Sequence, residues 1–399
     1  MKFIDAKNLL IDKVKVIETE IVDVRECFNI VLAEDLIADK DVPQFNRSPL
    51  DGYCFNSEYT KNANENNPIY FDIIEEVPCG KVAINKIDKF ETIKIMTGTK
   101  MPDGANCVIK YEDVELENGK LKLETKLNEN QNVILIGEDV KKGTILTKKG
   151  SIIDMGVIGI ATSLGIKELK VYRKLKVGFI STGSELLELN EDWVDGKIYN
   201  SNRYIFDAIF KKQNLEYKYY GIAYDNIEMT KNLFYKSIEE CDVVISTGGV
   251  SAGDYDLVDK ALIELGFNIF VKGIEMKPGM ACCFAEKNNK YILGLSGNPM
   301  SSVTTFYAVV LPAIKKMMGY KNFENKYFKV KLKNSFNKKI NKLRFLRAKV
   351  EIEDGIAVAT LNLDQGNIVI KSLIDCNGMI KVENVEEAKA GMSFDCMLI

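Results

Sequence analysis

Two glycine-containing segments carry the hydroxyl groups from which a phosphate-binding site can be built. One contains Ser181, Thr182, Gly183, Ser184 and Glu185, and the other contains Ser246, Thr247, Gly248, Gly249, Ser251, Asp254 and Asp256. Glycines let backbone N–H groups approach an anion closely, and the hydroxyl groups add further donors. Either segment alone is explained equally well as a tight turn between a strand and a helix.

Carboxylates in and near these segments indicate a divalent cation. Glu185, Asp254 and Asp256 belong to them, and Asp225 follows a third β-like run. A carboxylate repels phosphate, but it can hold Mg²⁺, which bridges carboxylate and phosphate oxygens. Together with the glycine turns, these acidic positions favour a magnesium-dependent phosphate site over a set of unrelated turns.

Two further turns add groups that attract anions. The first consists of Lys277, Pro278 and Gly279, and the second consists of Gly297, Asn298 and Pro299. A lysine before a Pro-Gly turn is usually a solvated charge, but this one lies between segments already expected to bind an anion. The second turn precedes a predicted helix, and helix N-termini favour negative charge.

The elements that position these residues alternate between strands and helices. Strands are predicted at residues 176–180, 216–220, 243–246 and 292–295, and helices at residues 202–212, 227–238, 257–265 and 301–318. This alternation predicts a mostly parallel, doubly wound α/β sheet. Ligands bind such sheets outside the carboxyl ends of the strands, where the polar segments lie.

The remaining sequence predicts several more domains, because 399 residues exceed what one hydrophobic core usually supports. An elongated helical and β domain is expected from residues 1–41 and 140–172, with a mainly β domain inserted at residues 42–139. The α/β domain is expected at residues 173–322, and a β-barrel-like domain at residues 323–399. On local chemistry alone, Asp51 and Thr97 in the inserted domain occupy ordinary turns.

Composition excludes several classes of function. Histidine is absent, which excludes His-based triads and His metal ligands, and the net charge of −3 gives no general attraction to nucleic acid or anionic membranes. Nine irregularly spaced cysteines without a CxxC pair fit neither a zinc cage nor a disulfide framework. No signal-peptide core or membrane-spanning apolar run is evident. We therefore expect a cytoplasmic enzyme for small-molecule substrates, with no nucleic-acid or membrane partner.

An ordered series of motifs resembles the molybdopterin molybdenumtransferases, including the corresponding domain of gephyrin, along essentially the whole chain. One such motif would be weak, but the ordered set is highly specific. The motifs include Ser48-Pro49-Leu50-Asp51-Gly52-Tyr53, Met96-Thr97-Gly98, Gly137-Glu138-Asp139, Ser181-Thr182-Gly183-Ser184-Glu185, Asn200-Ser201-Asn202-Arg203, Ser246-Thr247-Gly248-Gly249-Val250-Ser251, Met276-Lys277-Pro278-Gly279 and Gly297-Asn298-Pro299.

The resemblance implies a specific activity, which is the insertion of molybdate into adenylylated molybdopterin with Mg²⁺-dependent release of AMP. It implies a homodimer whose active site takes groups from the α/β domain of one subunit and the inserted domain of the other. Asp51, Thr97 and Asp139 match the functional residues of the inserted domain, and Glu185, Asp225 and Lys277 match those of the α/β domain. A molybdopterin adenylyltransferase and acceptor molybdoenzymes are the implied protein partners.

The chain also departs from the family pattern. Family members often have basic residues where Ile134, Leu135 and Ile136 stand, a lysine for Met280, a proline for Ser296, a serine for Asn367 and an aspartate for Ser184. Because several cations are missing near a site for oxyanions, a catalytically weak pterin-binding or scaffold protein is the main alternative. A stand-alone adenylyltransferase would share the α/β domain but would leave the inserted and C-terminal domains unexplained.

Overall fold

The polar segments at residues 181–185 and 246–250 lie at one edge of a six-stranded sheet. In this computed structural model, which describes residues 1–250, 257–362 and 364–399, the strand order is β14-β11-β15-β18-β17-β16. The strands are β11 (Lys176–Thr182), β14 (Glu216–Ala223), β15 (Val243–Thr247), β16 (Asn268–Lys272), β17 (Cys282–Lys287) and β18 (Lys290–Leu295). Neighbouring strands pair in parallel from β14 to β18, and β17 pairs antiparallel with both of its neighbours. The predicted mostly parallel α/β sheet is confirmed.

Helices cover both faces of this sheet, because its central strands are apolar on both sides. One face packs on Phe206 and Phe306, and the other packs on Phe234 and Ala261. The helices are α1 (Phe3–Lys13), α3 (Ser201–Lys212), α4 (Ile227–Glu240), α5 (Val258–Glu264), α6 (Pro299–Thr305) and α7 (Leu311–Met317). A π-helical turn, η4 (Phe306–Val310), joins α6 to α7, so the helix predicted at residues 301–318 starts earlier and is not uniformly α-helical.

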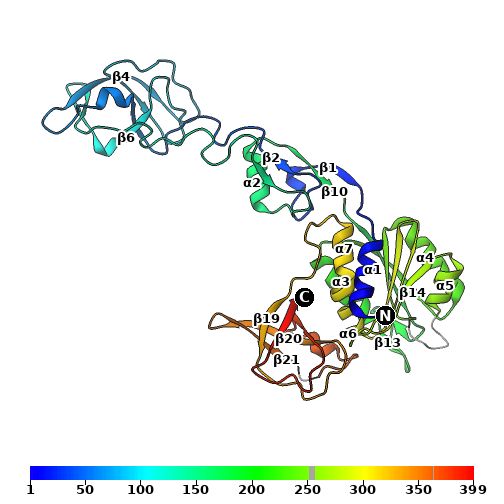
Figure 1. Cartoon of the computed structure of the whole chain (residues 1–399). Helices are drawn as coiled ribbons and strands as arrows, with labels where there is room; N and C mark the ends of the chain where they lie inside the picture. The colour runs from blue at the N-terminus through cyan, green and yellow to red at the C-terminus, as the bar shows by residue number, and fades with distance from the viewer. Residues whose placement is uncertain (251–256, 363) are drawn as a thin grey trace.

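The inserted segment forms a separate six-stranded sheet in the order β6-β3-β5-β4-β8-β7. Its strands are β3 (Gly52–Phe55), β4 (Ile69–Val77), β5 (Glu91–Ile95), β6 (Cys107–Lys110), β7 (Glu115–Glu117) and β8 (Lys120–Leu123), with short 3-10 helices η2 (Ser57–Thr60) and η3 (Tyr111–Asp113). This sheet lies at the far end of an elongated molecule, away from the α/β sheet (Figure 1).

A smaller group of elements lies between the two sheets (Figure 1). It combines the antiparallel pairs β1 (Thr19–Asp23) with β10 (Glu168–Tyr172) and β2 (Leu36–Ile37) with β9 (Ile145–Thr147), together with α2 (Met155–Ser163) and the 3-10 helix η1 (Val24–Glu26). Both flanks of the insertion contribute to its apolar core, for example Leu32 and Val171. The chain therefore leaves this part, builds the distal sheet and returns.

The C-terminal segment closes into a five-stranded barrel in the order β19-β21-β20-β22-β23. Its strands are β19 (Phe328–Leu332), β20 (Arg344–Glu353), β21 (Ile356–Leu361), β22 (Gly378–Val382) and β23 (Ser393–Leu398), and η5 (Ile370–Leu373) is a 3-10 helix. Phe345 of β20 packs on Phe3 of α1 with ring centroids 5.6 Å apart. This contact holds the barrel against the α/β part of the chain, beside the predicted site.

Candidate active site

A cavity of about 1300 Å³ lies at the carboxyl ends of the parallel strands. Thr182, Ala223 and Thr247 line it from the ends of β11, β14 and β15. Its other walls come from residues 275–281, from the turn at residues 296–299 and from the C-terminal barrel. The cavity therefore lies where an open α/β sheet is expected to bind its ligand.

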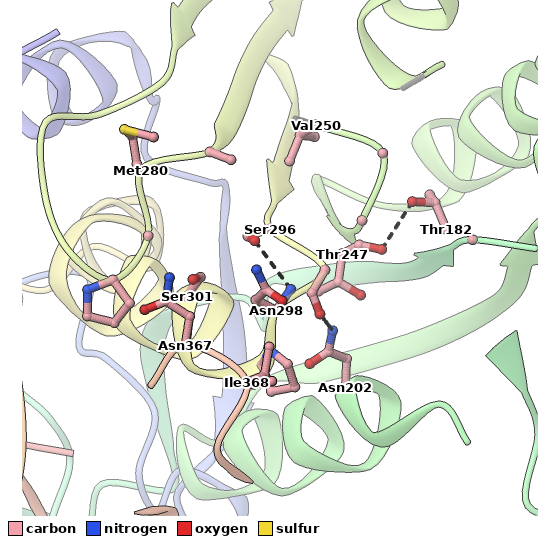
Figure 2. Close-up of a pocket in the computed structure, with 18 of the residues that line it drawn as sticks. Thr182, Asn202, Thr247, Val250, Met280, Ser296, Asn298, Ser301, Asn367 and Ile368 are labelled. Atoms are coloured by element: carbon pink, nitrogen blue, oxygen red, sulfur yellow. Dashed lines mark hydrogen bonds between the residues drawn. The ribbon is translucent and has the colours of Figure 1, made fainter. Parts of the chain in front are cut away.

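The two glycine segments pack directly against each other at this edge. Thr182 donates from Oγ1 to the carbonyl oxygen of Thr247 at 3.2 Å, as Figure 2 shows. The backbone N–H of Gly248 donates to Leu295 at 2.9 Å, and Gly248 adopts a φ of +96°. Thr182, Gly183, Gly248 and Gly249 all line the cavity, whereas Ser181 and Ser246 are buried within their strands.

Replacement of Gly248 tests this close packing. A Cβ atom at this position would lie 2.3 Å from the carbonyl oxygen of Thr182. We expect Gly248→Ala to cost about 1–2 kcal/mol through its left-handed backbone and about 1–3 kcal/mol more through overpacking. Gly391→Ala is the matched control, because Gly391 has a φ of +88° and open space around it. Equal thermal unfolding midpoints for the two variants would contradict the expected clash.

Two acidic side chains line the cavity beside these segments. Glu185 and Asp225 are both exposed, and the backbone N–H of Asp225 donates to Oγ of Ser184 at 2.9 Å. Ser184, which differs from the usual family residue, therefore anchors the loop that carries Asp225. The Glu185 carboxylate lies over Gly183, where a Cβ atom would approach Oε2 to 2.5 Å.

The cofactor-binding and metal-binding residues predicted from the sequence are only partly described. Ser251, Asp254 and Asp256 lie outside the described residues. Within residues 1–250, 257–362 and 364–399, no group of three or more His, Cys, Asp or Glu side chains could hold a metal ion. Of the predicted metal ligands, Glu185 and Asp225 lie on the cavity wall, which also carries Glu275.

The two remaining turns also line the cavity. They contribute Lys277, Pro278, Gly279, Gly297, Asn298 and Pro299. Asn298 precedes α6, and its backbone N–H donates to Oγ of Ser296 at 3.2 Å (Figure 2). Met280 is 67% exposed and lines the same cavity, so the position where relatives often carry a lysine does face the site.

Several oxygen atoms at this site are buried without a partner among the described residues. They are Oδ1 of Asn202, Oγ of Ser246 and Oγ1 of Thr247. Asn202 also donates from Nδ2 to the carbonyl oxygen of Gly297 at 2.8 Å, which fixes its side chain at the cavity. Because an unmet buried polar group is costly, Asn202 and Thr247 are prepared to bind a polar ligand. The sequence did not predict Asn202 as a site residue, although it belongs to the family motif Asn200-Ser201-Asn202-Arg203.

The C-terminal barrel supplies a wall that the sequence did not predict. Lys339, Lys342, Arg344, Asn367 and Ile368 line the cavity. Arg347 donates to the carbonyl oxygen of Gly366 at 3.0 Å, and the backbone N–H of Met300 donates to the carbonyl oxygen of Asn367 at 3.1 Å. The loop that carries Asn367 is therefore held from both the barrel and α6.

The residues proposed from the inserted domain lie elsewhere. Oδ1 of Asp51 accepts from the backbone N–H of Thr97 at 2.6 Å and from its Oγ1 at 2.8 Å. These bonds, the backbone one foremost, lower the pKa of Asp51. Asp139 is exposed where the chain leaves the distal sheet. Asp51, Thr97 and Asp139 do not line the cavity of their own chain, because the distal sheet lies at the other end of the molecule (Figure 1).

Family models match three parts of the chain. The MoeA N-terminal region (domain I and II) matches residues 1–165, a probable molybdopterin binding domain matches residues 178–316, and the MoeA C-terminal region (domain IV) matches residues 329–399. Among the described residues, every helix is too short or too polar to cross a membrane.

Individual proteins are similar over nearly the full length. A molybdopterin molybdenumtransferase from Staphylococcus epidermidis is 34% identical over 379 residues, which cover 94% of this chain and 90% of the relative. One from Staphylococcus aureus is 33% identical over 380 residues, with the same coverage. A solved molybdopterin biosynthesis MoeA protein from Pyrococcus horikoshii is 32% identical, with a TM-score of 0.84 and 100% coverage of both chains. The similarity thus includes both the cavity and the distal sheet.

Proposed function

Because this chain belongs to the molybdopterin molybdenumtransferase family, we propose that it inserts molybdate into adenylylated molybdopterin with Mg²⁺-dependent release of AMP. The observation that carries the proposal is the cavity at the strand ends, which has glycine turns and carboxylates on one side and basic side chains on another. Such a cavity suits a polyanionic ligand whose phosphates need both N–H donors and a cation.

Glu185 and Asp225 are the described residues that would hold Mg²⁺. Mg²⁺ in proteins is commonly bound through one or two carboxylates plus the phosphates of a substrate, and these two exposed carboxylates form no ion pair within the described parts of the chain. The bound ion would neutralise charge on the phosphoanhydride. The chain's own contribution would be to position the phosphates with unpaired polar groups of the glycine turns such as the hydroxyl of Thr247, because the N–H groups of Gly183 and Gly248 already donate to Ala223 and Leu295.

Asp51, Thr97 and Asp139 would complete the site from a second subunit. Asp51 and Thr97 lie at strand ends of the distal sheet, and Asp139 lies where the chain returns from it, so none of the three lines the cavity of its own chain, which supports this arrangement. The exposed pair of Asp51 and Thr97 is already held by two hydrogen bonds, so it needs little reorganisation before it meets a substrate. A molybdopterin adenylyltransferase would supply the substrate, and molybdoenzymes would accept the product.

Anaerobic incubation with adenylylated molybdopterin, Mg²⁺ and molybdate tests this function. We expect AMP to be released together with the incorporation of molybdenum into the pterin, and both to stop when Mg²⁺ is chelated. Omission of molybdate is the control that separates insertion from simple hydrolysis. If no AMP appears even at high molybdate while the pterin still binds, the chain is instead a binding or scaffold protein.

A further inference from the structure

Arg344 is a half-buried cation at the edge of the cavity. It is the first residue of β20 and lines the cavity together with Lys277 and Met280. Its guanidinium carbon lies 4.7 Å from the ring centroid of Phe336, so the side chain is packed on an aromatic face. Such packing restricts the side chain and reduces the entropy that it loses when it binds a ligand.

The guanidinium of Arg344 lacks a protein partner in the part of the chain that the structure describes. Its Nε–H group is buried and donates to no acceptor there, and Arg344 forms no ion pair with a carboxylate of the described residues. Burial lowers the pKa of Arg344, but an arginine remains charged at neutral pH. An unpaired charge in such a position is costly, so an anionic ligand would be bound strongly.

Backbone pairing fixes Arg344 beside Lys277 across the boundary between the α/β sheet and the barrel. The N–H of Lys277 donates to the carbonyl oxygen of Leu343 at 3.0 Å, and the N–H of Phe345 donates to the carbonyl oxygen of Lys277 at 2.9 Å. Lys277 and Arg344 thus form a parallel β-bridge. The barrel therefore brings a cation to the part of the cavity where Met280 provides none.

We propose that Arg344 binds a tetrahedral oxyanion in this cavity and supplies the positive charge that Met280 lacks. This inference rests on the proposed function for the identity of the anion. Molybdate and the phosphate of the adenylylated pterin share the required chemistry, because both present several oxygens to the N–H groups of a guanidinium. Separate titrations of the two substrates distinguish them.

The test compares Arg344→Gln with Arg344→Lys and with Lys349→Gln in the full-length protein. Lys349→Gln is a matched control because it removes one positive charge from the same strand, outside the cavity, where Lys349 pairs with Glu351. We expect Arg344→Gln to raise by at least about tenfold, or about 1.4 kcal/mol, either the molybdate concentration for half-maximal AMP release or the KM for the pterin. Arg344→Lys should raise the same value by a smaller factor, because it keeps the positive charge. Lys349→Gln should have the half-maximal molybdate concentration and the KM of the unmodified protein.

If Arg344→Gln changes only the molybdate titration, the bound anion is molybdate, and if it changes only the pterin titration, the anion is the phosphate of the pterin. A double variant tests whether Arg344 supplies the charge that Met280 lacks. Arg344→Gln combined with Met280→Lys should recover much of the lost affinity. Calorimetric binding of molybdate or inorganic phosphate to the substrate-free protein gives a readout that is independent of turnover. If the protein proves inactive, weaker binding by Arg344→Gln still supports the inference while the proposed function fails. If a folded Arg344→Gln protein binds anions as the unmodified protein does and keeps its half-saturation values, the inference about Arg344 is wrong.

Discussion

Glu185→Gln and Asp225→Asn should each lower Mg²⁺-dependent release of AMP by about a hundredfold or more, while the thermal unfolding midpoint stays unchanged. Each substitution removes a negative charge and one oxygen ligand but nearly preserves the size of the side chain. The magnitude follows from what is typically lost when one preorganised electrostatic group is removed from an active site. The fold should tolerate both changes, because both side chains are exposed at strand ends rather than packed in a core.

Single-turnover release of AMP at several Mg²⁺ concentrations is the measurement. If the carboxylates bind the ion, higher Mg²⁺ should restore part of the lost rate in each variant. Glu239→Gln is the control, since Glu239 is an exposed acid of the same domain on α4 and does not line the cavity. If the rate of AMP release falls but its dependence on Mg²⁺ concentration is unchanged, Glu185 and Asp225 do not bind the ion. If the thermal unfolding midpoint falls as well, their role is structural.

The α/β sheet was predictable because its signals are local. The runs at residues 176–180 and 243–246 are apolar and short, and both become buried strands, β11 and β15. Their carboxyl ends meet at one edge of the sheet, so the position of parallel strand ends alone predicts that Thr182 and Gly248 share a site. Glu185 and Asp225 follow by the same rule.

Other features depend on contacts between residues far apart in the sequence. The strands β16 and β17 were missed, because a short run such as residues 282–287 has no periodicity that separates a strand from a buried helical segment. The pairing of β1 with β10 joins segments separated by the whole insertion. No local pattern encodes such a pairing.

The basic residues that the barrel contributes to the cavity could not be predicted either, because their position also depends on contacts between residues far apart in the sequence. Arg344 belongs to a barrel strand, and only its bridge to Lys277 brings it to the site. In sequence it is one basic residue among several at residues 338–347, with no turn or glycine motif beside it. The missing lysine at Met280 was visible in the sequence, whereas the place of Arg344 at the same cavity became visible only in the fold.

The position of Asp51 and Thr97 leads to the most demanding prediction. They lie at the far end of the chain from Glu185 and Asp225, so one chain alone does not bring the two pairs together. A two-fold dimer can do so, because its symmetry generates each contact between the distal sheet of one subunit and the cavity of the other twice. A dimer that carries a cavity defect in one subunit and a distal-sheet defect in the other then has one doubly defective site and one intact site.

Mixed dimers of Asp51→Ala and Glu185→Ala subunits should therefore recover about half the activity of the unmodified dimer, although neither parent is active. The two subunits carry different affinity tags, and sequential purification yields the mixed dimer whose AMP release is measured. The matched control pairs Glu185→Ala with Asp225→Ala, because both residues line the same cavity and each site of that mixed dimer keeps one defect. Pairing Asp51→Ala with Thr97→Ala should likewise give no recovery. If the Asp51→Ala and Glu185→Ala mixture is as inactive as its parents, each site is built within one subunit and Asp51 has no place in the site of a partner.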